Sequence, residues 1–273
     1  MSVVTRFAPS PTGYLHVGHA FSAWTARSRA DRFLLRLEDI DHTRCRPDFA
    51  TAIMEDLTWL GLHWDGTPVI QSQKMRTYQN VIDSLNEREL LYPCFCSRSD
   101  IANAQSAPHE KASVYPGTCR NLSSSARSAA LGDKRGFALR LDLTEAMKQA
   151  GPKSFYEEGI GWCDMSPAVF GDVILARKDS PSSYHLCVVH DDAAMDINHV
   201  FRGDDLRGAT HIHVLLQSLL GLPTPVYSHH RLLRDEAGAR LSKRNGAVTL
   251  RALRQAGWTP DDILGRFKDD AKP

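Results

Sequence analysis

The segment that most constrains this chain lies near its start and reads RFAPSPTGYLHVGH from Arg6 to His19. Two prolines and a glycine exclude continuous regular structure between the apolar pair Val3-Val4 and Ala20. The residues after His19 follow a helical pattern, so we predict a strand, a loop and the start of a helix. Backbone N–H groups and the helix dipole at such a start suit an anion, in particular a nucleotide phosphate.

Two histidines in this segment, His16 and His19, are three positions apart across Gly18. Because Gly18 has no side chain, a flat ring or a phosphate could approach the backbone there. A proline-rich turn carrying two surface histidines is the alternative interpretation. The Ala-Pro-Ser-Pro-Thr-Gly order before the histidines favours the phosphate site.

The composition is that of an ordinary globular protein of one or two domains. The chain has 273 residues, of which 42% are hydrophobic and 24% charged, and its net charge is +1. No run approaches 18 apolar residues and no signal peptide is indicated, so we expect a cytoplasmic protein without a membrane partner. No obligate protein partner is evident. A protein of this charge that binds RNA needs a local basic face.

A β-α-β unit is predicted at the start of the chain. Apolar residues recur at helical spacing over Ala20–Arg32, and the apolar run Phe33–Leu37 is typical of a buried parallel strand. Glu38 and Asp39 follow that strand. In open α/β sheets ligands lie outside the carboxyl ends of the strands, which would put both acids beside the loop of Ser10. The acids could instead only cap the following turn.

Further elements are expected along the chain. Amphipathic helices are predicted over Pro47–Leu60, Met75–Glu89 and Thr210–Leu220. Strands are predicted over 136–141 and 170–177, in a small β-rich insertion. Residues 121–175 indicate no chemistry of their own.

Two residues of the second half are candidates for substrate contact. Tyr184 opens an apolar stretch and could also be an ordinary half-buried aromatic residue. Arg202 follows the predicted strand of Ile197–Phe201, where its guanidinium would suit a carboxylate in bidentate geometry.

Three of the six cysteines are spaced like metal ligands. Cys94 and Cys96 lie one residue apart, and Cys119 follows. Three thiolates are one ligand short of a structural zinc site, and free reduced thiols are the alternative. His109 is the chemically ordinary candidate for the fourth ligand.

Basic residues gather between Tyr227 and Arg254 and are opposed only by Asp235 and Glu236. They are Arg231, Arg234, Arg240, Lys243, Arg244, Arg251 and Arg254. Such a run is usually solvated surface. The order Arg240-Leu241-Ser242-Lys243-Arg244 within it is more specific.

The segment of His16 and His19 resembles the "HIGH" signature of class I aminoacyl-tRNA synthetases, in the wording of the glutamyl and glutaminyl branch. The run of Arg240 to Arg244 is similar to the second signature, "KMSKS", with Arg240 and Leu241 in place of lysine and methionine. The resemblance covers residues 3 to about 250. It implies an α/β fold with a Rossmann-like parallel sheet, an inserted zinc-containing subdomain and a short C-terminal helical extension. The implied units are 1–92 and 179–228 for the catalytic domain, 93–178 for the insertion and 229–273 for the second signature and extension.

The resemblance also implies a reaction, in which ATP with Mg²⁺ activates L-glutamate to glutamyl-AMP. The implied catalytic residues are His16, His19 and Lys243. Those implied for ATP are His16, Gly18, His19 and Lys243, and those for glutamate are Arg6, Ser10, Glu38, Tyr184 and Arg202.

An anticodon-binding half is expected to be missing, and this resembles the glutamyl-queuosine tRNA(Asp) synthetases. These enzymes activate glutamate without tRNA and attach it to queuosine in the anticodon loop of tRNA(Asp). The resemblance implies zinc bound by Cys94, Cys96, Cys119 and Tyr115, with His109 as the second choice for the fourth ligand. Val188 supports it, since glutamyl-tRNA synthetases usually have asparagine there, whereas His19 does not separate the branches.

The basic run would follow the phosphates of the anticodon loop, with the modified base above His16 and Lys243. Two other functions stay open. One is a truncated glutamyl-tRNA synthetase that charges the 3′ end of tRNA(Glu), and the other is a catalytically inactive RNA-binding module.

Replacing Lys243 with alanine should lower glutamate-dependent ATP–pyrophosphate exchange by roughly 10²-fold or more, the scale of losing one preorganised charge partner in a transition state. Exchange is measured with radiolabelled pyrophosphate. Unchanged exchange in the variant would contradict a role for Lys243 in the transition state.

Overall fold

The computed structural model describes residues 2–97, 100, 114–133, 136–180, 182–233 and 248–268. Lys243, the rest of the second signature and His109 lie outside these residues. Within them, no helix combines the length and the apolar composition that a bilayer crossing requires.

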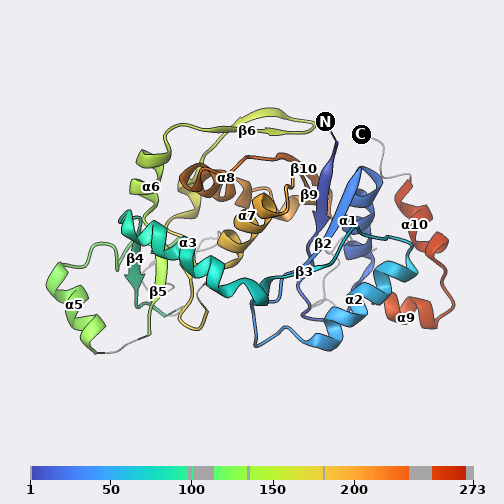
Figure 1. The fold of residues 1–273 in the computed structure, drawn as a ribbon, viewed down its shortest axis with the longest axis horizontal. Helices are drawn as coiled ribbons and strands as arrows, with labels where there is room; N and C mark the ends of the chain where they lie inside the picture. The colour runs from blue at the N-terminus through green and yellow to red at the C-terminus, as the bar shows by residue number, and fades with distance from the viewer. Residues whose placement is uncertain are drawn as a thin grey trace.

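Two sheets built mainly from parallel strands meet at the centre of the molecule (Figure 1). The first has the order β1-β2-β3, from Val4–Phe7, Arg32–Leu37 and Val69–Ile70, all parallel. The second has the order β7-β6-β10-β9, from Gly161–Asp164, Ser154–Glu157, Val226–His230 and His199–Gly203. They adjoin where Asn198, just before β9, hydrogen bonds to Val4: its N–H donates to the Val4 carbonyl (3.1 Å) and its side-chain oxygen accepts from the Val4 N–H (2.8 Å).

One group of helices packs on the first sheet. It comprises α1 (Val17–Ser28), α2 (Pro47–Trp59), α9 (Leu250–Gln255) and α10 (Pro260–Lys268). Phe33 and Leu35 of β2 pack in one apolar core with Ile53 and Leu57 of α2 and Phe267 of α10, all at most 1% exposed. The alternation of β1, α1 and β2 with buried apolar strands follows the sequence pattern of a parallel unit.

A second group of helices packs around α7 (Tyr184–Ala194), which contacts α8 (Ala209–Leu220) and α3 (Met75–Glu87). A single turn of 3₁₀ helix, η1 (Gln71–Lys74), leads from β3 into α3. Leu186, Cys187 and Val189 of α7 are at most 1% exposed in this second core. Helix α7 is therefore a central element.

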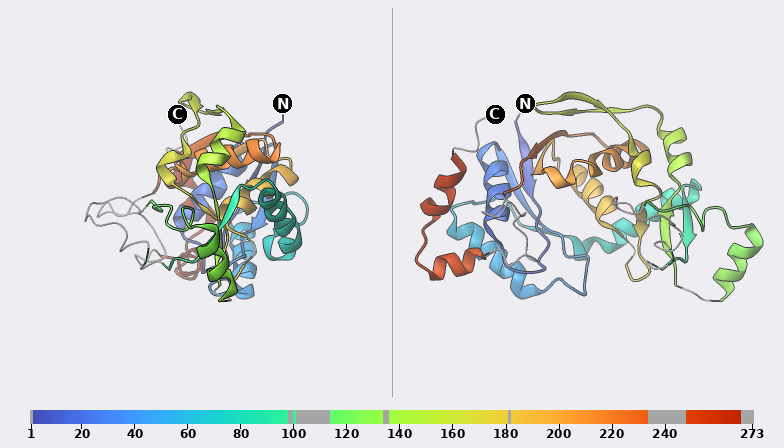
Figure 2. Two further views of the ribbon diagram at one scale, coloured as in Figure 1. Left: turned by 90° about the vertical axis from the view of Figure 1, so that its left-hand side faces the viewer. Right: turned by 180° about the vertical axis from the view of Figure 1, so that it is seen from behind.

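A third, antiparallel sheet lies at the end of the molecule opposite α10 (Figures 1 and 2). Its order is β4-β5-β8, from Leu91–Cys94, Ala138–Leu141 and Ile174–Ala176, and it is accompanied by α5 (Ser124–Gly132) and α6 (Leu143–Ala150). Strand β6 belongs to residues 93–178 as well, yet it pairs with β10 of the second sheet at Glu157 and Tyr227. The chain therefore crosses between the two units within the segment predicted as one insertion.

Two predicted elements differ from the structure. The helix predicted over 20–32 is α1, which runs from Val17 to Ser28, because His16 caps it and β2 already begins at Arg32. Of the strand predicted over 170–177, only the part from Ile174 to Ala176 forms, as β8. The residues before it do not extend the strand, because Pro167–Phe170 is the 3₁₀ helix η2 and Gly171 has a φ of 61°. The other three predicted helices agree within two residues, the usual uncertainty of helix ends.

Candidate active site

The two histidines of the first segment cap helix α1 reciprocally. His16 is the N-cap, and its Nδ1 accepts a hydrogen bond from the Gly18 N–H (3.1 Å). The Nδ1 of His19 accepts from the His16 N–H (3.2 Å), and the ring centres are 3.8 Å apart. A ring nitrogen that accepts carries no proton, so each neutral ring holds its proton on Nε2. Both rings thus carry N–H donors of defined position at a helix N-terminus, an arrangement that suits phosphate oxygens.

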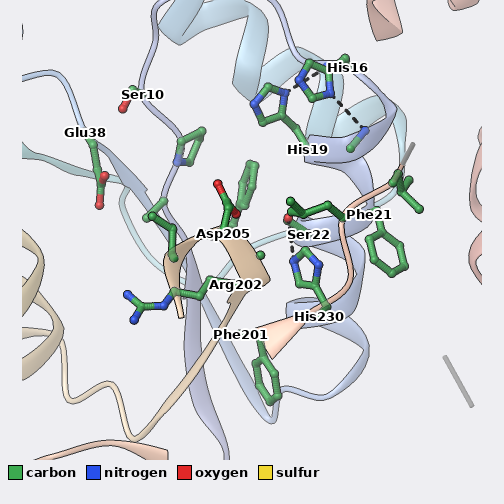
Figure 3. A pocket seen from close by; sticks show the side chains of 18 of the residues that line it. Ser10, His16, His19, Phe21, Ser22, Glu38, Phe201, Arg202, Asp205 and His230 are labelled. Atoms are coloured by element: carbon green, nitrogen blue, oxygen red, sulfur yellow. Dashed lines mark hydrogen bonds between the residues drawn. The ribbon is translucent and has the colours of Figure 1, made fainter. Parts of the chain in front are cut away.

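Eight of the predicted residues line one pocket of about 480 Å³ at the carboxyl ends of β1, β2 and β9. They are Arg6, Ser10, His16, Gly18, His19, Glu38, Tyr184 and Arg202. Figure 3 shows Ser10 and Glu38 on one side of the pocket and His16 and His19 on another. This is the edge of the sheet where ligands bind in open α/β folds.

A buried ion-pair network underlies this pocket. The Nε and Nη2 of Arg6 donate to the Asp192 carboxylate at 2.8 and 3.2 Å. Arg36, which is fully buried, donates to the same carboxylate at 2.6 Å and to Glu38 at 3.0 Å. The predicted carboxylate-binding residue Arg6 is therefore also the partner of a protein carboxylate. Neither Arg36 nor Asp192 was predicted.

The two acids after β2 have different surroundings. Burial raises the pKa of Glu38 despite the opposing effect of Arg36, and its backbone N–H donates to the Pro9 carbonyl of the loop (3.0 Å). Asp39 instead accepts from the N–H (2.8 Å) and hydroxyl (2.6 Å) of Ser72 in η1. Asp39 therefore holds the distant segment η1 and does not cap the turn that directly follows it, whereas Glu38 lines the pocket.

Arg202 is held by two histidines and a threonine. Its Nε donates to Nε2 of His229 (3.1 Å), its Nη1 to Nδ1 of His213 (3.1 Å) and its Nη2 to the hydroxyl of Thr210 (2.6 Å). A guanidinium can only donate, so both ring nitrogens must accept. Nδ1 of His229 then donates to Glu157 (2.9 Å).

These histidines are held neutral. Burial and the charge of Arg202 lower the pKa of His213 and of His229. The same two causes lower the pKa of His185, whose Nδ1 lies 3.2 Å from Nε2 of His213, to about 4. The three groups that hold Arg202 are therefore neutral, and among the described residues no carboxylate forms an ion pair with its guanidinium.

Tyr184 is the first residue of α7, and burial raises the pKa of its phenol, so the hydroxyl is neutral. Val188, the position that separates the branches in the sequence comparison, lies one turn further along α7 and is buried.

The basic run is described only in part. Arg251 and Arg254 lie over the rings of Tyr14 and Trp59 at 5.3 and 5.7 Å.

The three predicted cysteines lie together in a small apolar core beside β4, with ligand atoms within 4.8 Å of one another. The phenolic oxygen of Tyr115 is 3.5 Å from Sγ of Cys94 and 3.7 Å from Sγ of Cys96, and Sγ of Cys96 is 3.5 Å from Sγ of Cys119. Tetrahedral zinc with Zn–S near 2.3 Å and Zn–O near 2.0 Å places ligand atoms about 3.5 to 3.8 Å apart. The donor set and its spacing fit a zinc ion.

The chain is similar in sequence to known proteins over most of its length. The family model described as "tRNA synthetases class I (E and Q), catalytic domain" matches residues 2–266. A protein named glutamyl-Q tRNA(Asp) synthetase from Rhodobacter capsulatus is 46% identical, over 96% of this chain and 98% of that protein. A glutamate–tRNA ligase from Aquifex aeolicus is 36% identical, over 96% of this chain but 56% of that protein.

A solved structure has the same fold. The glutamate–tRNA synthetase of Elizabethkingia anophelis superposes with a TM-score of 0.80 at 25% identity. The match covers 97% of this chain and 60% of that one.

Replacing Asp192 with asparagine should destabilise the protein by about 3–5 kcal/mol at pH 7, because it removes the charge that two buried guanidinium groups share. Urea unfolding followed by circular dichroism measures this loss. Burial raises the pKa of Asp192, but Arg6 and Arg36 outweigh it and hold the pKa below its ordinary value. The difference from wild type should therefore be full above about pH 4 and shrink as the pH falls further. The exposed Asp164→Asn is the control, and an equally small loss in both variants would contradict this account.

Proposed function

Because the chain belongs to the family of class I glutamyl- and glutaminyl-tRNA synthetases, we propose that this ligase activates glutamate with ATP and transfers it to queuosine in the anticodon of tRNA(Asp). The near full-length match to a glutamyl-Q tRNA(Asp) synthetase carries the choice of acceptor. Several further proteins of that name, such as one from Nocardia farcinica at 42% identity, support it.

The charges of the pocket support glutamate as the amino acid. Of the lining residues, Arg6, Arg202 and Arg231 are positive and Glu38 and Asp205 negative, and the underlying pair Arg36 and Asp192 adds one charge of each sign. The histidines around Arg202 are neutral, so these groups sum to about +1. Glutamate, with two carboxylates and one ammonium group, has a charge of −1 and complements the pocket.

Each end of glutamate has a partner in this proposal. Arg202 and the remaining N–H groups of Arg6 bind carboxylate oxygens, and Ser10 and Tyr184 offer hydroxyl groups. Glu38 accepts from the ammonium group. Burial raises the pKa of Glu38, and an ammonium group beside it would favour the ionised form.

Class I synthetases use ATP and Mg²⁺ for activation. A glutamate carboxylate oxygen attacks the α-phosphorus, the bond to the β-phosphate breaks, and pyrophosphate leaves with the bonding electrons. The Nε2–H groups of His16 and His19, the N-terminus of α1 and Lys243 stabilise the charge on the phosphoryl oxygens. An RNA hydroxyl then attacks the acyl carbon, the bond to AMP breaks, and the hydroxyl proton leaves with the AMP phosphate or to water.

The acceptor can be tested directly with ATP, radiolabelled glutamate and purified tRNAs. Label should join tRNA(Asp) that carries queuosine and not the unmodified transcript, because the acylated hydroxyl belongs to the modified base. Removing the 3′-terminal adenosine should make no difference. If trimming abolishes the product, or tRNA(Glu) is the better acceptor, the enzyme is a glutamyl-tRNA synthetase of the ordinary kind.

We further propose that one structural zinc ion is bound by Cys94, Cys96, Cys119 and Tyr115. Three distances between these ligand atoms, 3.5 to 3.7 Å, support it because they match those expected around tetrahedral zinc. His109 lies outside the described residues, and the position of the Tyr115 oxygen favours the tyrosine. With four protein ligands no position is left for a reacting water, so the ion would hold the segment of Cys119 against β4.

Elemental analysis of the purified protein should find about one zinc per chain, and Cys119→Ser should lose most of it and unfold at lower temperature. Cys163→Ser is the matched control, since that half-buried thiol lies outside the cluster. A metal-free preparation that is folded and fully active would defeat the proposal.

A further inference from the structure

Three residues outside the pocket form a chain of polar contacts that ends on Arg202. The Nη1 of Arg207 lies 2.6 Å from Oε1 of Glu157. The same carboxylate oxygen lies 2.9 Å from Nδ1 of His229, and Nε2 of that ring accepts from the Nε of Arg202 at 3.1 Å. Arg202 lines the pocket proposed for glutamate, whereas the other three residues do not.

The pairing of strands in the second sheet fixes this chain. Strand β10 lies between β6 and β9, and its residue His229 is the register partner of Arg202. Glu157 is the last residue of β6, and Arg207 follows the 3₁₀ helix η3 (Asp204–Leu206) after β9. Glu157 also belongs to the segment predicted as an insertion. A residue of that segment therefore reaches a pocket residue through a single histidine.

The orientation of Arg202 requires one particular state of His229. The guanidinium can only donate, so Nε2 of the ring must carry no proton, and the ring proton lies on Nδ1, where Glu157 accepts it. A second proton on the ring would turn Nε2 into a donor that faces the N–H of Arg202. It would also place a positive charge beside the guanidinium. Arg202 would then have to turn away from the ring.

Arg207 balances the charge that would otherwise favour this second proton. The Glu157 carboxylate, which is 2% exposed, acts to raise the pKa of His229. Burial, the charge of Arg202 and the charge of Arg207 lower that pKa and outweigh the carboxylate. Arg207 is 39% exposed, so its guanidinium neutralises Glu157 from the solvent side.

The other titratable groups around His229 are neutral or already paired. They are His211 and His213 on α8, Tyr227 on β10 and Asp204 in η3. Burial lowers the pKa of both α8 histidines and raises that of the tyrosine to about 12. The exposed aspartate pairs with the Nε of Arg207 at 2.7 Å. Within the described part of the chain, Arg207 is thus the cation that neutralises Glu157.

We propose that Glu157 and Arg207 are positioning residues for the binding of glutamate. Together they keep His229 a neutral acceptor, and His229 holds Arg202 in the direction in which it binds a ligand carboxylate. The proposal rests on the function proposed above and adds to it two residues that touch neither glutamate nor ATP. The affinity for glutamate depends on them, whereas the affinity for ATP does not.

The exposed member of the chain gives the first test. In ATP–pyrophosphate exchange, Arg207→Gln should leave kcat and the KM for ATP within about twofold of wild type. Its KM for glutamate, relative to wild type, should be near one at about pH 8.5 and rise to roughly fivefold or more at about pH 6. The rise follows because an unbalanced Glu157 raises the pKa of His229, so the ring gains its second proton as the pH falls. Arg207→Lys keeps the charge and should match wild type at every pH.

A second variant separates the charge of Glu157 from its hydrogen bond. Glu157→Gln keeps an oxygen acceptor without a charge, so the double variant Glu157→Gln/Arg207→Gln should lose the rise at low pH that Arg207→Gln shows. Glu157→Ala removes the acceptor and should raise the KM for glutamate roughly tenfold at every pH. Lys148→Gln is the control, since it removes an exposed ion pair of the same 2.6 Å length in α6. This control should change neither KM nor pH profile.

The state of the ring can be measured without activity. In ¹⁵N spectra, with the His229 signals assigned by their loss in His229→Gln, the wild-type ring should be neutral with its proton on Nδ1 at about pH 6, and protonated in Arg207→Gln. An active Arg207→Gln enzyme with the KM and pH profile of wild type overturns the proposal. If wild type shows no glutamate-dependent exchange, the function proposed above fails instead. A ring in the same state in both proteins would then overturn the positioning role as well.

Discussion

The Asp192 carboxylate, shared by Arg6 and Arg36, is the interaction on which the rest of the site depends. It joins the carboxyl ends of β1 and β2 to helix α7 within the buried interior. A buried charge group of this kind adds little net stability, but removing one member leaves the others unpaired. The network thus fixes how α7 docks on the sheet. Tyr184, at the start of α7, takes its position in the pocket from that docking.

Two buried arginines of the site, Arg36 and Arg202, differ in the groups to which they donate hydrogen bonds. Arg36 donates to carboxylates of the protein, whereas Arg202 donates to neutral acceptors. Glu157 accepts a hydrogen bond from the other ring nitrogen of His229. The negative charge of Glu157 is compensated by Arg207, whose Nη1 lies 2.6 Å from its carboxylate oxygen. Arg202 is oriented as firmly as Arg36, yet its positive charge stays available to a ligand. Orientation without neutralisation is what a carboxylate-binding arginine requires.

Much of the site was predictable because its residues follow strands in a fold whose ligand edge is known. Ser10 and Glu38 come directly after β1 and β2, and the loop before α1 carries its own turn and capping signals. Arg36 could have been identified from the sequence, because a charged residue within the apolar run of β2 needs a buried partner of opposite charge. That partner, Asp192, lies 156 residues away, and no local pattern pairs the two. The histidines that hold Arg202 were missed for the same reason, as was the pairing of β6 with β10.

The structure gives a physical reason why glutamate activation need not wait for RNA. The charged groups of the proposed glutamate pocket are oriented by the protein itself: Arg202 by His213 and His229, and Glu38 by Arg36. The histidine rings at α1 are fixed by backbone N–H groups of their own turn. A site whose dipoles are already in place gains nothing from an RNA that would order them. The acceptor then contributes only the attacking hydroxyl, and the enzyme has to recognise only the nucleotide that carries it.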